Sequence, residues 1–143
     1  MIRAAGPDDA AAIAAIETSC FEAGAWSEAL LREHLGRDHH VVLVDGDLRA
    51  YGAISVSGEV ADLDRVAVVP AARRQRLAAG LLVALIDRAR GLGADRMLLE
   101  VSVDNAPAHN LYRTFGFDTI SRRNGYYPGR VDALVMKLDI KEA

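Results

Sequence analysis

Cysteine is nearly absent from this sequence, since Cys20 is the only one among 143 residues. A single cysteine cannot form a disulfide within the chain, excludes a cysteine-rich metal site and is consistent with a reducing compartment. The histidines, His34, His39, His40 and His109, show no spacing typical of metal ligands. We therefore expect no bound metal, and we expect Cys20 to be buried as a small apolar side chain.

Long apolar runs and a strong net charge are also absent. No apolar run reaches the roughly 18 residues that a membrane-spanning helix needs, and the N-terminus lacks the apolar segment of a signal peptide. The formal net charge is −3, which does not favour binding to nucleic acid. With 51% hydrophobic and 26% charged residues, the composition is that of a folded protein. We expect one domain over residues 1–143, cytoplasmic, monomeric or weakly dimeric, without direct contact with nucleic acid or membrane.

Apolar periodicity predicts strands and helices in a mixed order. Helical spacing predicts helices after Asp9, after Ser27, over residues 75–92 and from Asn105 to Gly116. Because a helix connects two of the strands, a right-handed crossover should make strands 59–69 and 97–103 parallel. We predict an α/β fold of the α+β type, with a mixed, mostly antiparallel sheet and helices on both faces. Strands are expected over residues 2–5, 41–44, 48–56, 59–69, 97–103, 117–122 and 131–138, with residues 124–129 as the last loop.

A basic segment, Arg73-Arg74-Gln75-Arg76, lies at the start of the predicted helix 75–92. The first amides of a helix lack intrahelical partners, and the helix dipole favours an anion beside them. In open α/β sheets, ligands tend to bind near such junctions between parallel strands. The segment is therefore a candidate phosphate site, although a solvated basic helix end also explains it.

Several further motifs share a family pattern: Val66-Ala67-Val68-Val69-Pro70, Leu99-Glu100-Val101, Phe115-Gly116-Phe117 and Tyr126-Tyr127-Pro128. Together with residues 7–9, 26–28, 73–78, 105, 111–112 and 122–125, they make nearly the whole chain resemble the GCN5-related N-acetyltransferase (GNAT) superfamily, and within it the RimI type. The resemblance implies the GNAT fold, a seven-stranded sheet with a splayed central parallel pair. It also implies acetyl-CoA as co-substrate without a metal, and acetyl transfer to the N-terminal alanine of a small-subunit ribosomal protein.

The resemblance assigns cofactor contacts to two segments. Main-chain groups of Val66, Ala67 and Val68 would bind the pantetheine arm, whether or not their side chains also pack in the core. Asn105 would contact the cofactor, or would serve only as a helix cap. The diphosphate would lie on Arg73, Arg74, Gln75, Arg76, Leu77, Ala78 and Ala79.

Arg76 departs from the family pattern, which has glycine at this position of the phosphate loop. Glycine allows the backbone close to the diphosphate and tolerates unusual φ angles. An arginine would either crowd the cofactor or swing outward and add a cation for a phosphate. We expect the backbone cradle to be retained, with the affinity for acetyl-CoA as the property affected.

The reaction implied by the resemblance needs a base and an acid. An α-amino group has a pKa of about 7.7–8.0, against about 10.4 for lysine, so an N-terminal acceptor is more easily deprotonated. Glu100, a carboxylate inside an apolar strand, matches the family base, although a solvent-facing position or an arginine partner would also explain it. Tyr112 matches the family's proton donor to the leaving thiolate, or it packs as an aromatic anchor. A main-chain amide near Val68 could stabilise the carbonyl oxygen.

The resemblance places the acceptor near Trp26, Glu28, Tyr126 and Tyr127. Ordinary packing of the last hairpin would also explain the two tyrosines, and Gly125 interrupts the family's Asn-Tyr-Tyr run. The leading prediction is an acetyl-CoA-dependent N-terminal acetyltransferase. The alternatives are a lysine or small-amine acetyltransferase on the same fold and a non-catalytic acyl-CoA-binding regulatory domain.

Overall fold

The computed structural model describes residues 1–21 and 24–141. The helices are α1 (Ala10–Cys20), α2 (Glu28–Leu35), α3 (Leu77–Gly91) and α4 (Ala106–Thr114), with short 3-10 helices at Pro7–Asp9 and Pro70–Ala72. The strands are β1 (Ile2–Ala4), β2 (His40–Asp45), β3 (Ala50–Ser57), β4 (Val60–Val68), β5 (Arg96–Ser102), β6 (Asp118–Tyr127) and β7 (Val131–Asp139). Within the described ranges, no helix has both the length and the apolar composition needed to span a membrane.

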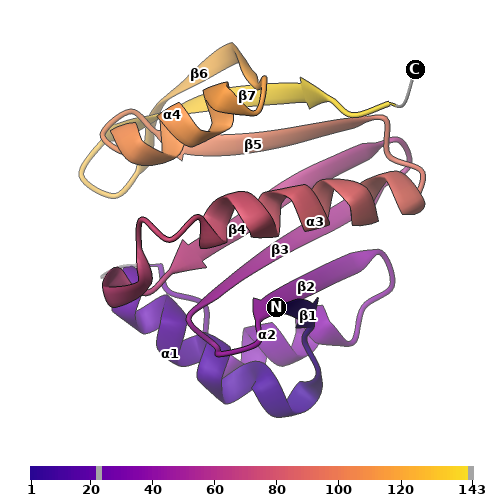
Figure 1. Cartoon of the computed structure of the whole chain (residues 1–143). Helices are drawn as coiled ribbons and strands as arrows, with labels where there is room; N and C mark the ends of the chain where they lie inside the picture. Colours follow the sequence, from indigo (N-terminus) through magenta and orange to yellow (C-terminus); the bar gives the residue numbers. More distant parts are fainter. Residues whose placement is uncertain (22–23, 142–143) are drawn as a thin grey trace.

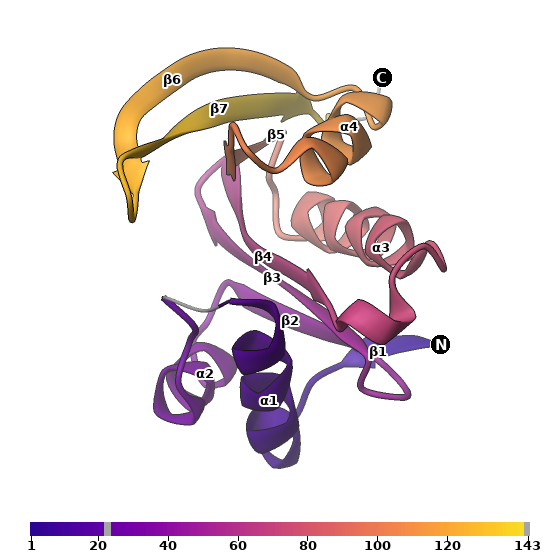
Figure 2. The ribbon, with the colours of Figure 1, turned by 90° about the vertical axis from the view of Figure 1, so that its left-hand side faces the viewer.

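The seven strands form one sheet in the order β1-β2-β3-β4-β5-β7-β6. All neighbouring pairs are antiparallel except β4 and β5, which are parallel. Helices α1 and α2 cover one face and α3 and α4 the other, so the sheet has a buried core on each side (Figures 1 and 2). The predicted fold class, including the parallel central pair, is confirmed.

A β-bulge in β4 changes which face its side chains reach. Ala53 of β3 pairs with Arg65, whereas the next residue, Ile54, pairs with Leu63, so Asp64 is the extra residue. A bulge reverses the alternation of side chains along a strand. Leu63 therefore belongs to the core beside α3, and Ala67, four residues later, to the core beside α1 and α2.

The parallel ladder between β4 and β5 is short. In the described structure it joins Val60 to Arg96, Ala61 to Met97 and Asp62 to Leu98, and it ends where the bulge begins. Beyond Asp62 one edge of β4 stays paired with β3, while the edge toward β5 carries main-chain groups outside any ladder. The two strands thus separate toward their C-terminal ends, next to the start of α4 (Figure 2).

Most predicted elements are confirmed to within a few residues, but the predicted loop at 124–129 is wrong. Strand β6 continues through Tyr127, and only residues 128–130 separate it from β7. The reason lies across the hairpin, where the Asp132 carboxylate accepts hydrogen bonds from Arg122 Nε (2.8 Å) and from the amide of Gly125 (2.8 Å). These bonds hold an irregular stretch with Gly125 at φ +61° inside the strand.

Candidate active site

A continuous cleft runs along the separated ends of β4 and β5. We divide it into a loop section at the start of α3 (about 340 Å³), a strand section between β4 and α4 (about 450 Å³), a central section between β4 and β5 (about 550 Å³) and a hairpin section beside β6 and β7 (about 460 Å³). Neighbouring sections share lining residues, in turn Val68 and Leu111, then Val66 and Tyr112, then Glu100 and Tyr127.

The backbone of the loop section is built around two left-handed residues. Arg74 has φ +67° and Arg76, which precedes the first turn of α3, has φ +62°. Arg76 therefore adopts a conformation that glycine takes without strain and that costs other residues about 1 kcal/mol. The first α-helical hydrogen bond runs from the amide of Gly80 to the carbonyl of Arg76 (3.1 Å), so the three preceding helical amides lack intrahelical partners.

Two side-chain hydrogen bonds hold this loop in place. Arg73 Nε donates to the carbonyl of Val68 (3.0 Å), and Arg49 donates to the Gln75 side-chain oxygen (3.2 Å). Arg73, Arg74 and Arg76 line the loop section, and none of its described lining residues is acidic. Unpaired amides, cations and the lack of carboxylates fit a diphosphate. The residues present therefore suit the phosphate end of acetyl-CoA.

The strand section continues this path past Val66, Ala67 and Val68. Their predicted contribution was the main chain, and their edge toward the cleft is the one outside the β4–β5 ladder. The Val68 carbonyl also accepts a hydrogen bond from Cys20 Sγ (3.3 Å). The prediction that Cys20 is a buried apolar side chain is only partly confirmed, because the side chain packs against the core beside α1 but is partly exposed and lines the cleft. The end of α1 reaches over β4, which the sequence did not reveal.

The helix-cap interpretation of Asn105 is confirmed, and its contact with the cofactor stays a prediction. Its side-chain oxygen accepts a hydrogen bond from the amide of Ala108 (3.3 Å) and so caps α4. The same residue lines the strand and central sections.

Glu100 lies on β5 and lines both the central and the hairpin sections. Its Oε1 atom is 3.8 Å from a terminal nitrogen of Arg123, a long ion pair, while Oε2 is buried without a hydrogen-bond partner. The arginine partner considered from sequence is thus present, but at a distance too long for a hydrogen bond. The neighbouring Glu100 carboxylate also raises the pKa of the Tyr126 phenol.

Tyr112 projects from α4 into the central section, which Glu100 also lines. Its ring is buried and meets Phe117 edge-on, with ring centroids 5.7 Å apart. Burial raises the pKa of Tyr112 to about 12. The phenol is therefore protonated at neutral pH and can donate a hydrogen bond or a proton. Aromatic anchor and proton donor are compatible roles for this residue.

The predicted acceptor residues divide into two groups. Tyr126 and Tyr127 line the hairpin section, with their rings edge-on at 5.0 Å. Trp26 and Glu28 are not among the residues that line the cleft. Trp26 stacks on His34 at 4.8 Å, and Glu28 forms an exposed ion pair with Arg32 at 3.3 Å.

Sequence reasoning missed two charged residues of the central and hairpin sections, Asp64 and Arg65. Asp64 Oδ2 is buried without a hydrogen-bond partner, and burial raises the pKa of Asp64 to about 6. The available signal was the charged interruption of an apolar strand at residues 62–65. In the described residues, no group of three His, Cys, Asp or Glu side chains is arranged to hold a metal ion.

Comparison with known proteins places this geometry in a family. The Acetyltransferase (GNAT) family matches residues 10–117. The chain is 35% identical over 120 residues to the ribosomal protein bS18-alanine N-acetyltransferase of Escherichia coli, covering 80% of this chain and 81% of that protein.

Solved structures agree with the family match. The crystal structure of the ribosomal-protein-S18-alanine N-acetyltransferase from Escherichia coli superimposes with a TM-score of 0.90 and 33% identity, over 100% of this chain and 95% of that one. A Salmonella typhimurium acetyltransferase structure with its cofactor acetyl-CoA has a TM-score of 0.80 and 25% identity, over 100% and 95% of the two chains. The chain thus belongs to the GNAT acetyltransferase family and is an acetyl-CoA-dependent N-acetyltransferase of that type.

Proposed function

We propose that this enzyme acetylates the α-amine of a protein N-terminus, with the N-terminal alanine of a small-subunit ribosomal protein as the leading acceptor. The observation that carries the proposal is one cleft in which a phosphate-binding loop, Tyr112 and Glu100 follow one another. Support for the acceptor comes from the relatives, several of which are named as ribosomal protein bS18-alanine N-acetyltransferases.

The loop section and the main chain of β4 would hold acetyl-CoA, through the residues 66–68 and 73–79 together with Asn105. When bound, acetyl-CoA supplies an acetyl group activated as a thioester. Glu100 accepts the proton of the acceptor amine, whose lone pair forms the new C–N bond. Tyr112 gives its proton to the sulfur released when the C–S bond breaks. The Tyr112 phenol, with a pKa of about 12, holds that proton until the thiolate appears.

The hairpin section would receive the acceptor. It is open to solvent at the β6–β7 hairpin, it adjoins Glu100, and Tyr126 and Tyr127 offer rings and hydroxyls to a peptide end. Three carboxylates, of Asp62, Asp64 and Glu100, line this section beside two guanidinium groups, of Arg65 and Arg123. The excess of carboxylates attracts an ammonium before it loses its proton. Trp26 and Glu28 would not touch the acceptor and would affect it only through the residues that line the cleft.

The experiment compares two peptides of the same length that differ in the amine they offer. One has a free N-terminal alanine and no lysine, and the other has a blocked N-terminus and an internal lysine. We expect acetylation of the first peptide, measured by mass spectrometry. Transfer to the blocked peptide alone would contradict the N-terminal assignment and indicate a lysine acetyltransferase. Binding of acetyl-CoA without transfer to either peptide or to small amines would indicate an acyl-CoA-binding regulatory domain.

A further inference from the structure

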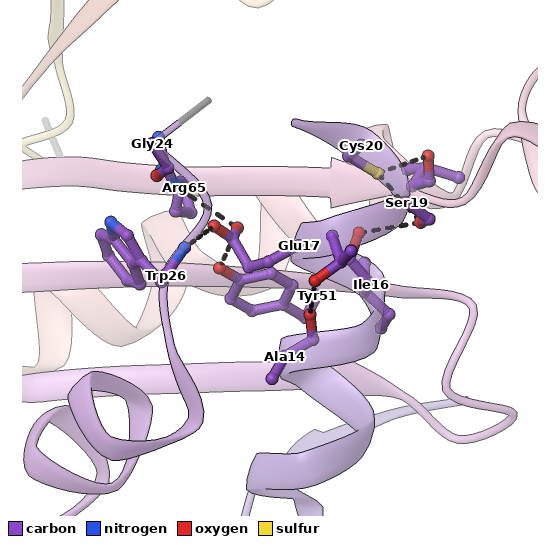
Figure 3. A network of polar contacts seen from close by, with 11 residues as sticks. Ala14, Ile16, Glu17, Ser19, Cys20, Gly24, Trp26, Tyr51 and Arg65 are labelled. Carbon is purple, nitrogen blue, oxygen red and sulfur yellow. Dashed lines mark hydrogen bonds and ion pairs between the residues drawn. The ribbon is translucent and has the colours of Figure 1, made fainter. Parts of the chain in front are cut away.

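Glu17 is a buried charged group that the proposed mechanism does not use. It lies near the end of α1 with its side chain fully buried. Its carboxylate accepts hydrogen bonds from the amide of Trp26 (2.7 Å) and the hydroxyl of Tyr51, and it lies 3.4 Å from Arg65 Nε (Figure 3). An isolated buried carboxylate is strongly unfavourable, so these partners are what allow Glu17 to remain at this position.

Arg65 connects this carboxylate to the segment between α1 and α2. One terminal nitrogen donates to the carbonyl of Gly24 (2.7 Å). Its guanidinium lies 4.5 Å from the ring centroid of Phe21 and 4.8 Å from that of Trp26. Arg65 is the first residue after the β4 bulge, and it pairs with Ala53, whose side chain belongs to the core beside α1. The bulge therefore gives β4 a cation on the α1 side of the sheet.

The same contacts reach the acceptor end of the cleft. Arg65, Phe21 and Gly24 line the central section together with Glu100, and Arg65 also lines the hairpin section. Phe21 and Gly24 thus belong to the wall across from Glu100 on β5. The loop section is braced by different residues, Arg73 and Arg49, which do not contact Glu17 in the described structure.

We propose that Glu17 and Arg65 are positioning residues: they hold Phe21 and Gly24, which line the cleft, and Trp26, which packs behind them, in place for the acceptor. This inference rests on the proposed function for its kinetic consequence. The Glu17 carboxylate binds the amide of Trp26. Arg65 binds the carbonyl of Gly24 and packs against the rings of Phe21 and Trp26. Loss of either residue releases one wall of the acceptor site, while the diphosphate site keeps its own braces.

The kinetic test uses Glu17→Gln, which keeps an oxygen acceptor but removes the charge opposite Arg65, and Arg65→Met, which removes the cation. We expect both to raise the KM for the alanine peptide about tenfold. The KM for acetyl-CoA should rise less, by under about threefold, because Phe21 also lines the strand section while the diphosphate site keeps its own contacts. Arg65→Lys retains the positive charge but not the several N–H donors of the planar guanidinium. We expect its peptide KM to lie about halfway, on a logarithmic scale, between those of the wild type and Arg65→Met. The matched control is Asp9→Asn, which breaks the Arg3–Asp9 ion pair (2.8 Å) at the other end of α1.

A second readout does not depend on activity. Trp26 is the only tryptophan, and it contacts both Glu17 and Arg65, so its fluorescence reports on this network. We expect Glu17→Gln and Arg65→Met to increase quenching of Trp26 by acrylamide about twofold, and Asp9→Asn to leave it unchanged although it lowers the melting temperature. Unchanged quenching in both network variants would overturn the inference, whatever the peptide assay shows. Failure of the wild-type enzyme to acetylate any peptide would instead contradict the proposed function, while increased quenching would still establish the anchoring.

Discussion

The two ends of the cleft offer different kinds of chemical group to a ligand. At the loop section the proposed binding groups are main-chain amides at the start of α3, next to the left-handed residues Arg74 and Arg76. At the hairpin section they are ionisable side chains, with the carboxylates of Asp64 and Glu100 facing the cleft. The first end depends on backbone conformation and the second on side-chain identity and charge.

This difference explains how the phosphate loop can contain an arginine where its family has glycine. Every residue except proline carries an amide, so the cradle survives any substitution that keeps the φ angle. Arg76 keeps it, at φ +62°. At the hairpin end no backbone group can replace a lost carboxylate, so we expect the largest effects of substitution there.

The sharpest test of the comparison is Glu100→Gln. It removes the proposed base but keeps nearly the same shape, so we expect kcat for the alanine peptide to fall about 10²-fold to 10⁴-fold at pH 7.5. Acetyl-CoA affinity, measured by calorimetry, should stay within about twofold because the loop section is unaltered. Near wild-type kcat would mean that another carboxylate of the hairpin section, Asp62 or Asp64, accepts the proton.

A smaller loss is expected for Tyr112→Phe. The ring and its contact with Phe117 are retained, and only the proton donor is removed. We expect turnover to fall about 10-fold to 100-fold with acetyl-CoA binding nearly unchanged. Wild-type turnover in this variant would remove Tyr112 from the mechanism and leave it as an aromatic anchor.

The features that the sequence could predict are those formed by residues close together in the chain. The helix start at the loop section and the parallel strands on either side of it were predictable because both signals occur in consecutive residues, whereas phosphate binding there stays a prediction. The helix caps at Ser27 and Asn105 were predictable for the same reason, and both are confirmed by hydrogen bonds to the amides of Leu30 (3.1 Å) and Ala108 (3.3 Å).

The remaining features depend on contacts between residues far apart in the chain. Nothing in the segment around Asp64 indicates that it is an extra residue opposite β3, because a bulge is defined by its pairing partner. Likewise, the partners of Glu17 lie 9, 34 and 48 residues away, at Trp26, Tyr51 and Arg65. Short motifs cannot identify such an arrangement.

The backbone interpretation of the loop section can be tested by comparing Arg76→Gly with Arg76→Ala. Both remove the side chain, but only glycine adopts the left-handed conformation without strain. We expect the glycine variant to be more stable than the alanine variant by about 1 kcal/mol in urea unfolding. Acetyl-CoA affinity should fall by less than about threefold in the glycine variant, as expected if amides carry most of the binding. A loss above about tenfold would show that the Arg76 cation, rather than the cradle, binds the phosphate.

The smallest expected effect concerns pH and the acceptor end. The folded-state pKa of Asp64 is about 6, above its usual value of 3.8, because burial disfavours the charged form. The unfolded chain therefore loses this proton more readily, so Asp64 contributes most to stability below about pH 4, and this contribution is lost as the pH rises through 6. Asp64→Asn should accordingly raise the melting temperature by about 2 °C at pH 8, with the difference shrinking as the pH is lowered from 6 to 4. Calorimetric scans at these pH values check this, with Asp118→Asn as a control at an exposed carboxylate of β6 that does not line the cleft. A gain in melting temperature that does not depend on pH would show that burial does not raise the pKa of Asp64. The contrast between a hairpin section that depends on charge and a loop section that depends on the backbone would then lose this support.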